Sequence, residues 1–575
     1  MKRSCTKTLR ELHAHLIRTG FHLDPTSISP VLISYSSSSP HLADARILFD
    51  QIQPTTFNSN SMIRAYAQSE HLPKEAIPIY DQMRALDLTM NDLTFLFYLK
   101  ACTRLQYILH GRKAHLHSFK LGFGSYLFIS NAFIHMYGMC GDFYSARKMF
   151  DEMPDRDLVS WNSLICGYSQ NSQFGEVLSV FQAMQMEGVK ADAVTMVKVV
   201  LACSHLGDSE FADSVVKYIE RNNVEIDVYL GNTLIDLYGR RGSVESARNI
   251  FDVMRKRNIV SWNTMIMSYA KAGKLVAARE LFDKMPVKDV ISWTSMITGY
   301  SHCNKFSDAL KLFREMMKDR VKPDKITITT VISACAHLGT LDVGQAVHEY
   351  MYFHDIKADI HVGNSLIDMY FKCGSAEKAL NVFHEMGEKD TVSWNTLITG
   401  LALNGYATEA LELFADMLSK GFRPCEVTYI GVLAACTHAG LVDKGLQHFE
   451  NMQKVHQIEP TTKHYGCVVD LLSRSGLLDK AYEFLKNLPI DLDAMAWRIL
   501  LNACRLHRNV VLAEIVSNKL WELDPSNSGN YVLLSNTYAG LDRWADAGTM
   551  RKLMKESDVQ KAPGWSSIGV NGSES

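Results

Sequence analysis

The stretch DLVSWNSLICGYSQ, residues 157–170, contains the pattern that decides the predicted fold. Its tetrapeptide VSWN recurs, as V/I-S-W-N/T, at three further places in the chain. The four tryptophans are spaced 101, 31 and 101 residues apart: Trp161, Trp262, Trp293 and Trp394. A fixed period of this kind is the sequence signature of a repeat protein.

Two further motifs follow the same spacing. The pattern G/S-N-x-x-I-x-x-Y ends at tyrosines that are 101 and 132 residues apart: Tyr137, Tyr238 and Tyr370. The pattern A-C-x-H/R contains cysteines that are 101, 132 and 101 residues apart: Cys102, Cys203, Cys335 and Cys436. All three series therefore belong to one array, whose 101-residue period divides into repeats of 35, 35 and 31 residues.

The array is expected to occupy residues 26–493. Its predicted repeats are 92–126, 127–157, 158–192, 193–227, 228–258, an extra short repeat 259–289, 290–324, 325–359, 360–390, 391–425, 426–461 and 462–493, after two looser repeats near 26–55 and 56–91. Within 158–192, apolar residues recur at i, i+3, i+4 and i+7, first from Trp161 and again from Val177. This spacing predicts two amphipathic helices in each repeat, and stacked helix pairs form a solenoid.

Composition restricts the function. Sixty Lys and Arg residues against 62 Asp and Glu residues give a formal charge of −2, so no overall basic field indicates nucleic acid. No C-x-x-C motif, secretory signal or membrane-length apolar segment is found, and the twelve cysteines are expected to be free thiols in a reducing compartment. We expect no metal, no cofactor and no membrane association.

The chain resembles the plant pentatricopeptide repeat family, PLS class. The resemblance rests on DLVSWNSLICGYSQ (157–170), YLGNTLIDLYGRRGSVESARNIFDVM (229–254) and ITTVISACAHLGTLDVGQAVHEYM (328–351). It implies an all-α, right-handed superhelical α-solenoid of helix-turn-helix repeats. Residues 494–572 resemble the E-type extension of organellar RNA-editing factors, which indicates the E subgroup. Residues 1–25 are either a partial repeat or a targeting segment, and 573–575 form a tail.

Many relatives continue into a DYW cytidine-deaminase domain, whose zinc chemistry needs H-x-E followed by P-C-x-x-C. The only notable H-x-E here, at residues 448–450, lies within a predicted second helix and has no P-C-x-x-C after it. The resemblance therefore implies no catalytic residues and a protein that is not an enzyme by this route.

In this family the fifth and last residues of a repeat select one RNA base, and the second residues of neighbouring repeats sandwich it. Carried over to this chain, the pairs expected to select uracil are Asn131/Asp157, Asn162/Asp192, Asn263/Asp289 and Asn364/Asp390. Asn60/Asn91 and Asn232/Asn258 are expected to select cytosine, Thr294/Asp324 guanine, and Asn395/Cys425 a pyrimidine without clear preference. The pairs expected to read weakly or not at all are Leu96/Tyr126, Val197/Asp227 and Thr329/Asp359.

The resulting RNA site is C-N-U-U-N-C-U-G-N-U-Y, read 5′ to 3′. The expected sandwiching residues are Phe128, Val159, Tyr229, Val260, Ile291, His361 and Val392. Each pair has a plainer interpretation, because a polar residue at a helix start also serves as a cap. The tryptophans are more consistent with core packing than with base stacking, and so are the recurring cysteines.

The favoured hypothesis is a site-recognition factor for C-to-U editing of an organellar transcript, with a DYW-type deaminase or other editing factors supplied in trans. The alternatives are an organellar splicing, stability or translation factor without a role in editing, and a tetratricopeptide-like protein scaffold. The sequence does not choose between mitochondrion and chloroplast, although the mitochondrion is slightly favoured.

Overall fold

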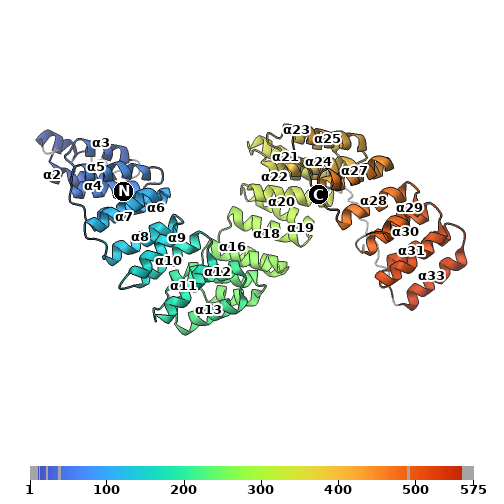
Figure 1. Cartoon of the computed structure of the whole chain (residues 1–575), viewed down its shortest axis with the longest axis horizontal. Helices are drawn as coiled ribbons and strands as arrows, with labels where there is room; N and C mark the ends of the chain where they lie inside the picture. The colour runs from blue at the N-terminus through green and yellow to red at the C-terminus, as the bar shows by residue number, and fades with distance from the viewer. Residues whose placement is uncertain are drawn as a thin grey trace. The chain divides into compact units, whose positions relative to one another are not determined.

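The computed structural model describes residues 11, 13–20, 24–36, 41–488, 493–557 and 559. The chain divides into two compact halves, Met1–Val287 and Lys288–Ser575, called the N-terminal and C-terminal halves below. Most of the expected N-terminal segment and all of the expected tail lie outside the described residues. Every element described is helical, so the predicted all-α helix-turn-helix solenoid is confirmed in each half (Figure 1).

In the N-terminal half the first helices of successive repeats pack side by side in one row. They are α2 (Pro25–Ser36), α4 (Thr56–Gln68), α6 (Asp92–Leu105), α8 (Leu127–Met139), α10 (Leu158–Gln170), α12 (Ala193–Leu206), α14 (Val228–Arg240) and α16 (Ile259–Lys271). The second helices are α3 (Leu42–Asp50), α5 (Ala76–Ala85, preceded by the short η3, Pro73–Glu75), α7 (Ile108–Lys120), α9 (Phe143–Glu152), α11 (Phe174–Met186), α13 (Ser209–Arg221), α15 (Val244–Val253) and α17 (Leu275–Lys284).

The C-terminal half repeats this arrangement. Its first helices are α18 (Val290–His302), α20 (Lys325–Leu338), α22 (Ile360–Lys372), α24 (Thr391–Leu403), α26 (Glu426–Ala439), α28 (Thr462–Arg474), α30 (Ala494–Leu506) and α32 (Ser528–Ala539). Its second helices are α19 (Phe306–Lys318), α21 (Leu341–Phe353), α23 (Ala376–Glu385), α25 (Ala407–Ser419), α27 (Val442–Lys454), α29 (Leu478–Lys486), α31 (Val510–Leu523) and α33 (Trp544–Glu556).

Short and long repeats differ mainly in their second helix. In the short repeats α9 and α23 have 10 residues, whereas α11 and α25 in neighbouring long repeats have 13. The first helices differ by only one residue: α8 of a short repeat and α10 of a long repeat have 13 residues, and α12 of a long repeat has 14. The change of period is therefore accommodated mainly by the second helices.

The recurring aromatic and cysteine residues form the core. Trp161, Trp293 and Trp394 are at most 3% exposed, and Trp394 packs edge-on against Phe383 at a centroid distance of 5.0 Å. The cysteines of the A-C-x-H/R series are at most 1% exposed, as is Cys504. The described residues contain no group of three side chains suited to a metal ion, and none of their helices is long and apolar enough to span a membrane. Burial excludes these tryptophans as stacking platforms for a ligand.

One pair of first helices approaches unusually closely. A Cβ built on Gly167 of α10 would lie 2.7 Å from the Cα of Gly138 in α8, closer than real side chains tolerate against backbone. We expect Gly167→Ala to force the two helices apart and to lower the free energy of unfolding by about 1–3 kcal/mol, the usual cost of overpacking. Urea denaturation followed by circular dichroism measures this change.

Gly175 in α11 provides the matched control. A Cβ at Gly175 would meet nothing within 4 Å, and its backbone is ordinary helix. Gly175→Ala should therefore raise the free energy of unfolding by roughly 0.5–1 kcal/mol, because alanine loses less conformational freedom in a helix than glycine does. Equal effects of the two substitutions would contradict the close approach.

Candidate nucleic-acid interface

The last residue of each expected repeat is the N-cap of the following first helix. At Asp157, Oδ1 accepts hydrogen bonds from the backbone N–H of Ser160 at 2.8 Å and from the Ser160 hydroxyl at 2.8 Å. Such caps satisfy backbone donors that a helix start leaves unpaired. The same role is filled by Asn91, Asp192, Asn258, Asp289, Asp324 and Asp390. The sequence spacing D/N-x-x-S/T could have identified these caps beforehand.

The fifth residue of the same repeat binds this capping oxygen as well. Asn131 Nδ2 donates to Asp157 Oδ1 at 3.1 Å, across two neighbouring first helices. Further amide donations are Asn60 to Asn91 at 2.9 Å, Asn162 to Asp192 at 3.2 Å, Asn232 to Asn258 at 3.4 Å and Asn364 to Asp390 at 3.4 Å. Oγ1 of Thr294 lies 3.4 Å from Asp324 Oδ1 and 2.8 Å from the carbonyl oxygen of Val290. The remaining pair, Asn263 and Asp289, is divided between the two halves.

These bonds leave one atom of each last residue unused. Oδ1 of Asp157 and Asp192 is occupied, whereas Oδ2 accepts no hydrogen bond from the described residues. In Asn91 and Asn258, Oδ1 is occupied in the same way and Nδ2 donates none. An aspartate therefore offers an outer acceptor and an asparagine an outer donor. Because the cap fixes Oδ1, the identity of the outer atom follows directly from the residue type.

The fifth-position amides are less accessible to a ligand than the sequence analysis expects. Asn60 and Asn131 are 6% and 5% exposed, and their Oδ1 atoms are buried without a hydrogen-bond partner. Oδ1 of Asn232 and Asn364 is in the same state. The sequence analysis expects these amides to offer both a donor and an acceptor to a base. In the structure one of the two amide N–H groups donates to the last residue, and the acceptor Oδ1 is buried.

Asn395 and Cys425 form a variant of the pair. Asn395 Nδ2 donates to Cys425 Sγ at 3.2 Å, so the sulfur takes the place of the capping oxygen. Burial raises the pKa of the Cys425 thiol, but hydrogen bonds from Thr428 and Asn395 outweigh it and hold that pKa below its usual value. A cysteine has no second polar atom, so this repeat presents neither an outer donor nor an outer acceptor.

The capping carboxyls of Asp157 and Asp192 are stabilised in their ionised form. Burial disfavours the charged form of Asp157 and Asp192, but hydrogen bonds from Ser160 and Thr195 outweigh it and lower the pKa of both carboxyls. Because the folded-state pKa is lowered, their contribution to stability is present above the ordinary aspartate pKa of about 4. It is lost as the pH falls through the lowered folded value.

The second residues form an exposed row beside the caps. Side chains of this type are usually buried, yet Val159 is 54% exposed and Tyr229 is 75% exposed. The other expected sandwiching residues are exposed too: Phe128, Val260, Ile291, His361 and Val392. In the C-terminal half a cavity of about 420 Å³ is lined by Val392 and Val427, the second residues of successive repeats, and by Asn395. This cavity is large enough for a planar ring between two apolar side chains.

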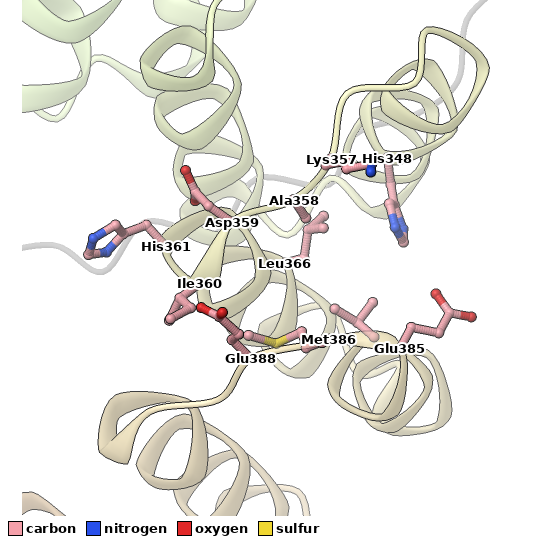
Figure 2. A pocket seen from close by; sticks show the side chains of 12 residues that line it. His348, Lys357, Ala358, Asp359, Ile360, His361, Leu366, Glu385, Met386 and Glu388 are labelled. Atoms are coloured by element: carbon pink, nitrogen blue, oxygen red, sulfur yellow. The ribbon is translucent and has the colours of Figure 1, made fainter.

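A second cavity lies near the start of α22 (Figure 2). It measures about 630 Å³, and its walls include Lys357, Asp359, Glu385 and Glu388. Figure 2 shows His361 on one side and Glu385 on the opposite side. Asp359 is paired with Lys325 at 3.1 Å, and the remaining two glutamates against Lys357 give the wall little attraction for a phosphate group. Of its lining residues, only Asp359 and His361 belong to the last and second positions of the repeats.

Other residues singled out by the sequence take structural roles. The ring of His448, in the H-x-E triplet, lies edge-on to Phe414 at 5.6 Å, and burial lowers the pKa of its imidazole. Cys140 and Cys373 lie near the methionine sulfur atoms one turn earlier in their helices. The residues that sequence reasoning missed are the third residues of the repeats. Ser160 and Thr195 both bond to the preceding cap, and Thr195 also contacts the fifth residue Asn162.

The chain is thus a helical-repeat protein, and each half presents a row of hydrogen-bond donors, acceptors and exposed side chains along its first helices. A repeat model described as PPR repeat family matches residues 156–205, 288–337 and 389–438, and one described as PPR repeat matches 128–158, 232–259, 260–290, 364–391, 427–455 and 463–489. An E motif model matches residues 507–569. The chain belongs to the pentatricopeptide repeat family, and the E motif agrees with the E subgroup.

Relatives in Arabidopsis thaliana match almost the whole chain. It is 42% identical to pentatricopeptide repeat-containing protein At2g22410, mitochondrial, over 98% of this chain and 83% of that protein. It is 40% identical to putative pentatricopeptide repeat-containing protein At3g15930 over 99% and 83% of the two chains. The crystal structure of maize PPR10 in complex with an 18-nt psaJ RNA element resembles it in fold, with a TM-score of 0.55, 17% identity and coverage of 96% and 85%.

Proposed function

We propose that this protein binds one single-stranded RNA sequence, with the fifth and last residues of each reading repeat selecting a base together. The outer atom of the last residue separates bases that show a ring N–H from cytosine, and the fifth residue separates uracil from guanine. The observation that carries the proposal is the fixed cap, which leaves an acceptor at Asp157 and Asp192 and a donor at Asn91 and Asn258. Uracil shows a ring N–H that pairs with an acceptor, whereas cytosine shows a ring nitrogen that pairs with a donor. The fold shared with RNA-bound PPR10 supports RNA as the ligand.

The proposed target is C-N-U-U-N-C-U-G-N-U-Y. Its first position faces repeat 56–91 and its eleventh faces repeat 391–425, where Cys425 has no outer atom and accepts either pyrimidine. The exposed second residues hold each base from both sides, and the alternation of 35- and 31-residue repeats supports the PLS class. Contacts to base faces, worth about 1–3 kcal/mol where they are aromatic, supply affinity that the near-zero net charge does not.

We further propose that the bound RNA is an organellar transcript that undergoes C-to-U editing. The E motif at residues 507–569 supports this role, and a deaminase recruited in trans would supply the chemistry. Mitochondria are the proposed compartment, because the relative At2g22410 is named as mitochondrial. Sequencing organellar cDNA from a knockout tests the role directly. Normal editing at every site, with altered transcript sizes or unspliced introns, would instead assign the protein to splicing or stability.

Substitution of Tyr229 tests whether second residues stack on the bases, independently of which base each repeat selects. Its ring is 75% exposed in the free protein, so Tyr229→Ala removes a stacking surface without opening a core cavity. We expect affinity for the proposed RNA to fall by about 1–3 kcal/mol, measured by fluorescence anisotropy. Tyr144→Ala is the control, because Tyr144 is 78% exposed on a second helix, α9, away from the row. A similar loss in both variants would contradict the assignment.

A further inference from the structure

In three of the 35-residue repeats, the fifth residue is contacted directly by the third residue of the next repeat. Thr195 Oγ1 lies 2.5 Å from Asn162 Oδ1 and 2.8 Å from Asp192 Oδ1. Equivalent hydroxyl contacts join Thr428 to Asn395 at 2.6 Å and Thr327 to Thr294 at 2.6 Å. The fifth-position side chain of these repeats is therefore held from two directions, by the last residue and by the threonine.

Short repeats lack this second contact. The Ser160 hydroxyl accepts from the backbone N–H of Asp157 at 3.2 Å and donates to Asp157 Oδ1 at 2.8 Å. It makes no hydrogen bond to Asn131, whose Oδ1 stays buried and unpaired. Ser261 and Ser393 leave Asn232 and Asn364 in the same condition. All of these serines and threonines are fully buried, so none can touch RNA in this arrangement.

The two arrangements differ in how firmly they hold the amide. A buried acceptor without a donor is destabilising, so the amide of Asn131 gains by turning outward when a ligand offers a donor. The amide of Asn162 would break two hydrogen bonds on turning. Because the amide also engages the capping oxygen, its fixation keeps the outer carboxylate oxygen of Asp192 in one orientation. A base-contacting side chain held in one orientation discriminates more strongly between bases than a mobile one does.

We propose that the buried third residue is a positioning residue that sets how strictly the preceding repeat selects its base. Threonine fixes the fifth-position side chain and makes selection strict, whereas serine leaves it free to turn and makes selection permissive. This inference rests on the proposed function. It predicts that two repeats with the same Asn/Asp pair, 127–157 and 158–192, differ in selectivity at the third and fourth RNA nucleotides.

Repeat 56–91 shows that threonine alone is not sufficient. Thr94 bonds only to Asn91, and Asn60 Oδ1 remains unpaired. This repeat is one residue longer than 158–192, which places its fifth residue 34 positions before the threonine rather than 33. Thr94→Val therefore removes a buried threonine hydroxyl beside a capping residue, as Thr195→Val does, but it removes no contact with a fifth residue.

The experiment measures the ratio of dissociation constants for RNA carrying cytosine or uracil at one position. In the wild type we expect a larger ratio at the fourth nucleotide than at the third. Thr195→Val should lower the fourth-position ratio about 5-fold, the effect of one net hydrogen bond, and leave the third unchanged. Thr195→Ser, which installs the residue found in short repeats, should act in the same direction and is less disruptive to folding. Thr94→Val should leave uracil–cytosine discrimination at the first nucleotide unchanged.

The outcomes separate this inference from the proposed function. An unchanged fourth-position ratio in both Thr195 variants, with a wild type that prefers uracil there, would overturn the inference alone. If the Thr195 variants lowered the cytosine/uracil ratio equally at the third and fourth nucleotides, the inference would also be overturned. A matching decrease at the first nucleotide in Thr94→Val would overturn it too, because the effect would then come from weakened helix caps in general. A wild type without uracil preference at either position would overturn the proposed function itself.

Discussion

Asp157→Asn combined with Asp192→Asn is expected to change the preferred RNA from U-U to C-C at the third and fourth positions. Each substitution exchanges an outer acceptor for an outer donor, while Oδ1 remains available as the cap. Asn91 and Asn258 already cap first helices in this chain, so the fold should be retained. A mismatch costs about 1–3 kcal/mol, and each position changes from disfavouring cytosine to favouring it. The affinity for C-C relative to U-U should therefore rise by at least about 700-fold over the two positions.

Competition binding with the two RNAs measures this ratio. Asp227→Asn is the matched control, because Asp227 caps α14 in the same half and its repeat has Val197 instead of an amide at the fifth position. That variant should leave the base preference of the neighbouring repeats unchanged. If the double variant binds both RNAs as the wild type does, selection through the outer atom is wrong.

Trp394→Ala is expected to have the largest effect on stability. The indole of Trp394 is 1% exposed and packs against Phe383 and Phe422, with Lys420 Nζ over its ring at 5.0 Å. Removing a buried aromatic side chain of this size costs about 3–5 kcal/mol. Urea denaturation should therefore show a much lower free energy of unfolding in the variant.

Trp544 is the control that shows whether the loss of stability comes from the burial of the side chain or from the loss of any tryptophan. It lies in the same half but is 66% exposed at the start of α33. Trp544→Ala should change the free energy of unfolding by no more than about 0.5 kcal/mol, as is usual for surface positions. A small effect of Trp394→Ala would show that the neighbouring helices collapse into the vacated space.

Much of the fold was predictable because it depends on periodic burial. The stripe beginning at Trp161 and the buried position of Cys203 follow from spacing alone, and the structure confirms both. The exposed state of Val159 and Tyr229 was predictable only from the family resemblance, since an apolar side chain usually indicates the core. The selection of bases by these repeats stays a prediction.

The hydrogen-bond geometry was not predictable in the same way. Sequence reasoning treats Asn131 as an open amide, whereas packing of the next first helix buries its Oδ1. Serine and threonine look interchangeable at the third position, yet the hydroxyl of Thr195 reaches the preceding fifth residue and that of Ser160 does not. That difference depends on how the neighbouring first helices pack against each other, which the residue type at the third position does not reveal by itself.

In both halves, each first helix packs against its immediate neighbours in the row. A substitution at one capping residue is thus separated from distant repeats, and under the proposed base selection its effect is confined to a single nucleotide of the target. Under that proposal, single substitutions can change the RNA target one nucleotide at a time while the helical fold is retained. Gain or loss of a whole repeat would instead shift the pairing of every later repeat with its nucleotide. Proteins with this kind of array should therefore change their RNA target by point substitutions far more readily than by changes in repeat number.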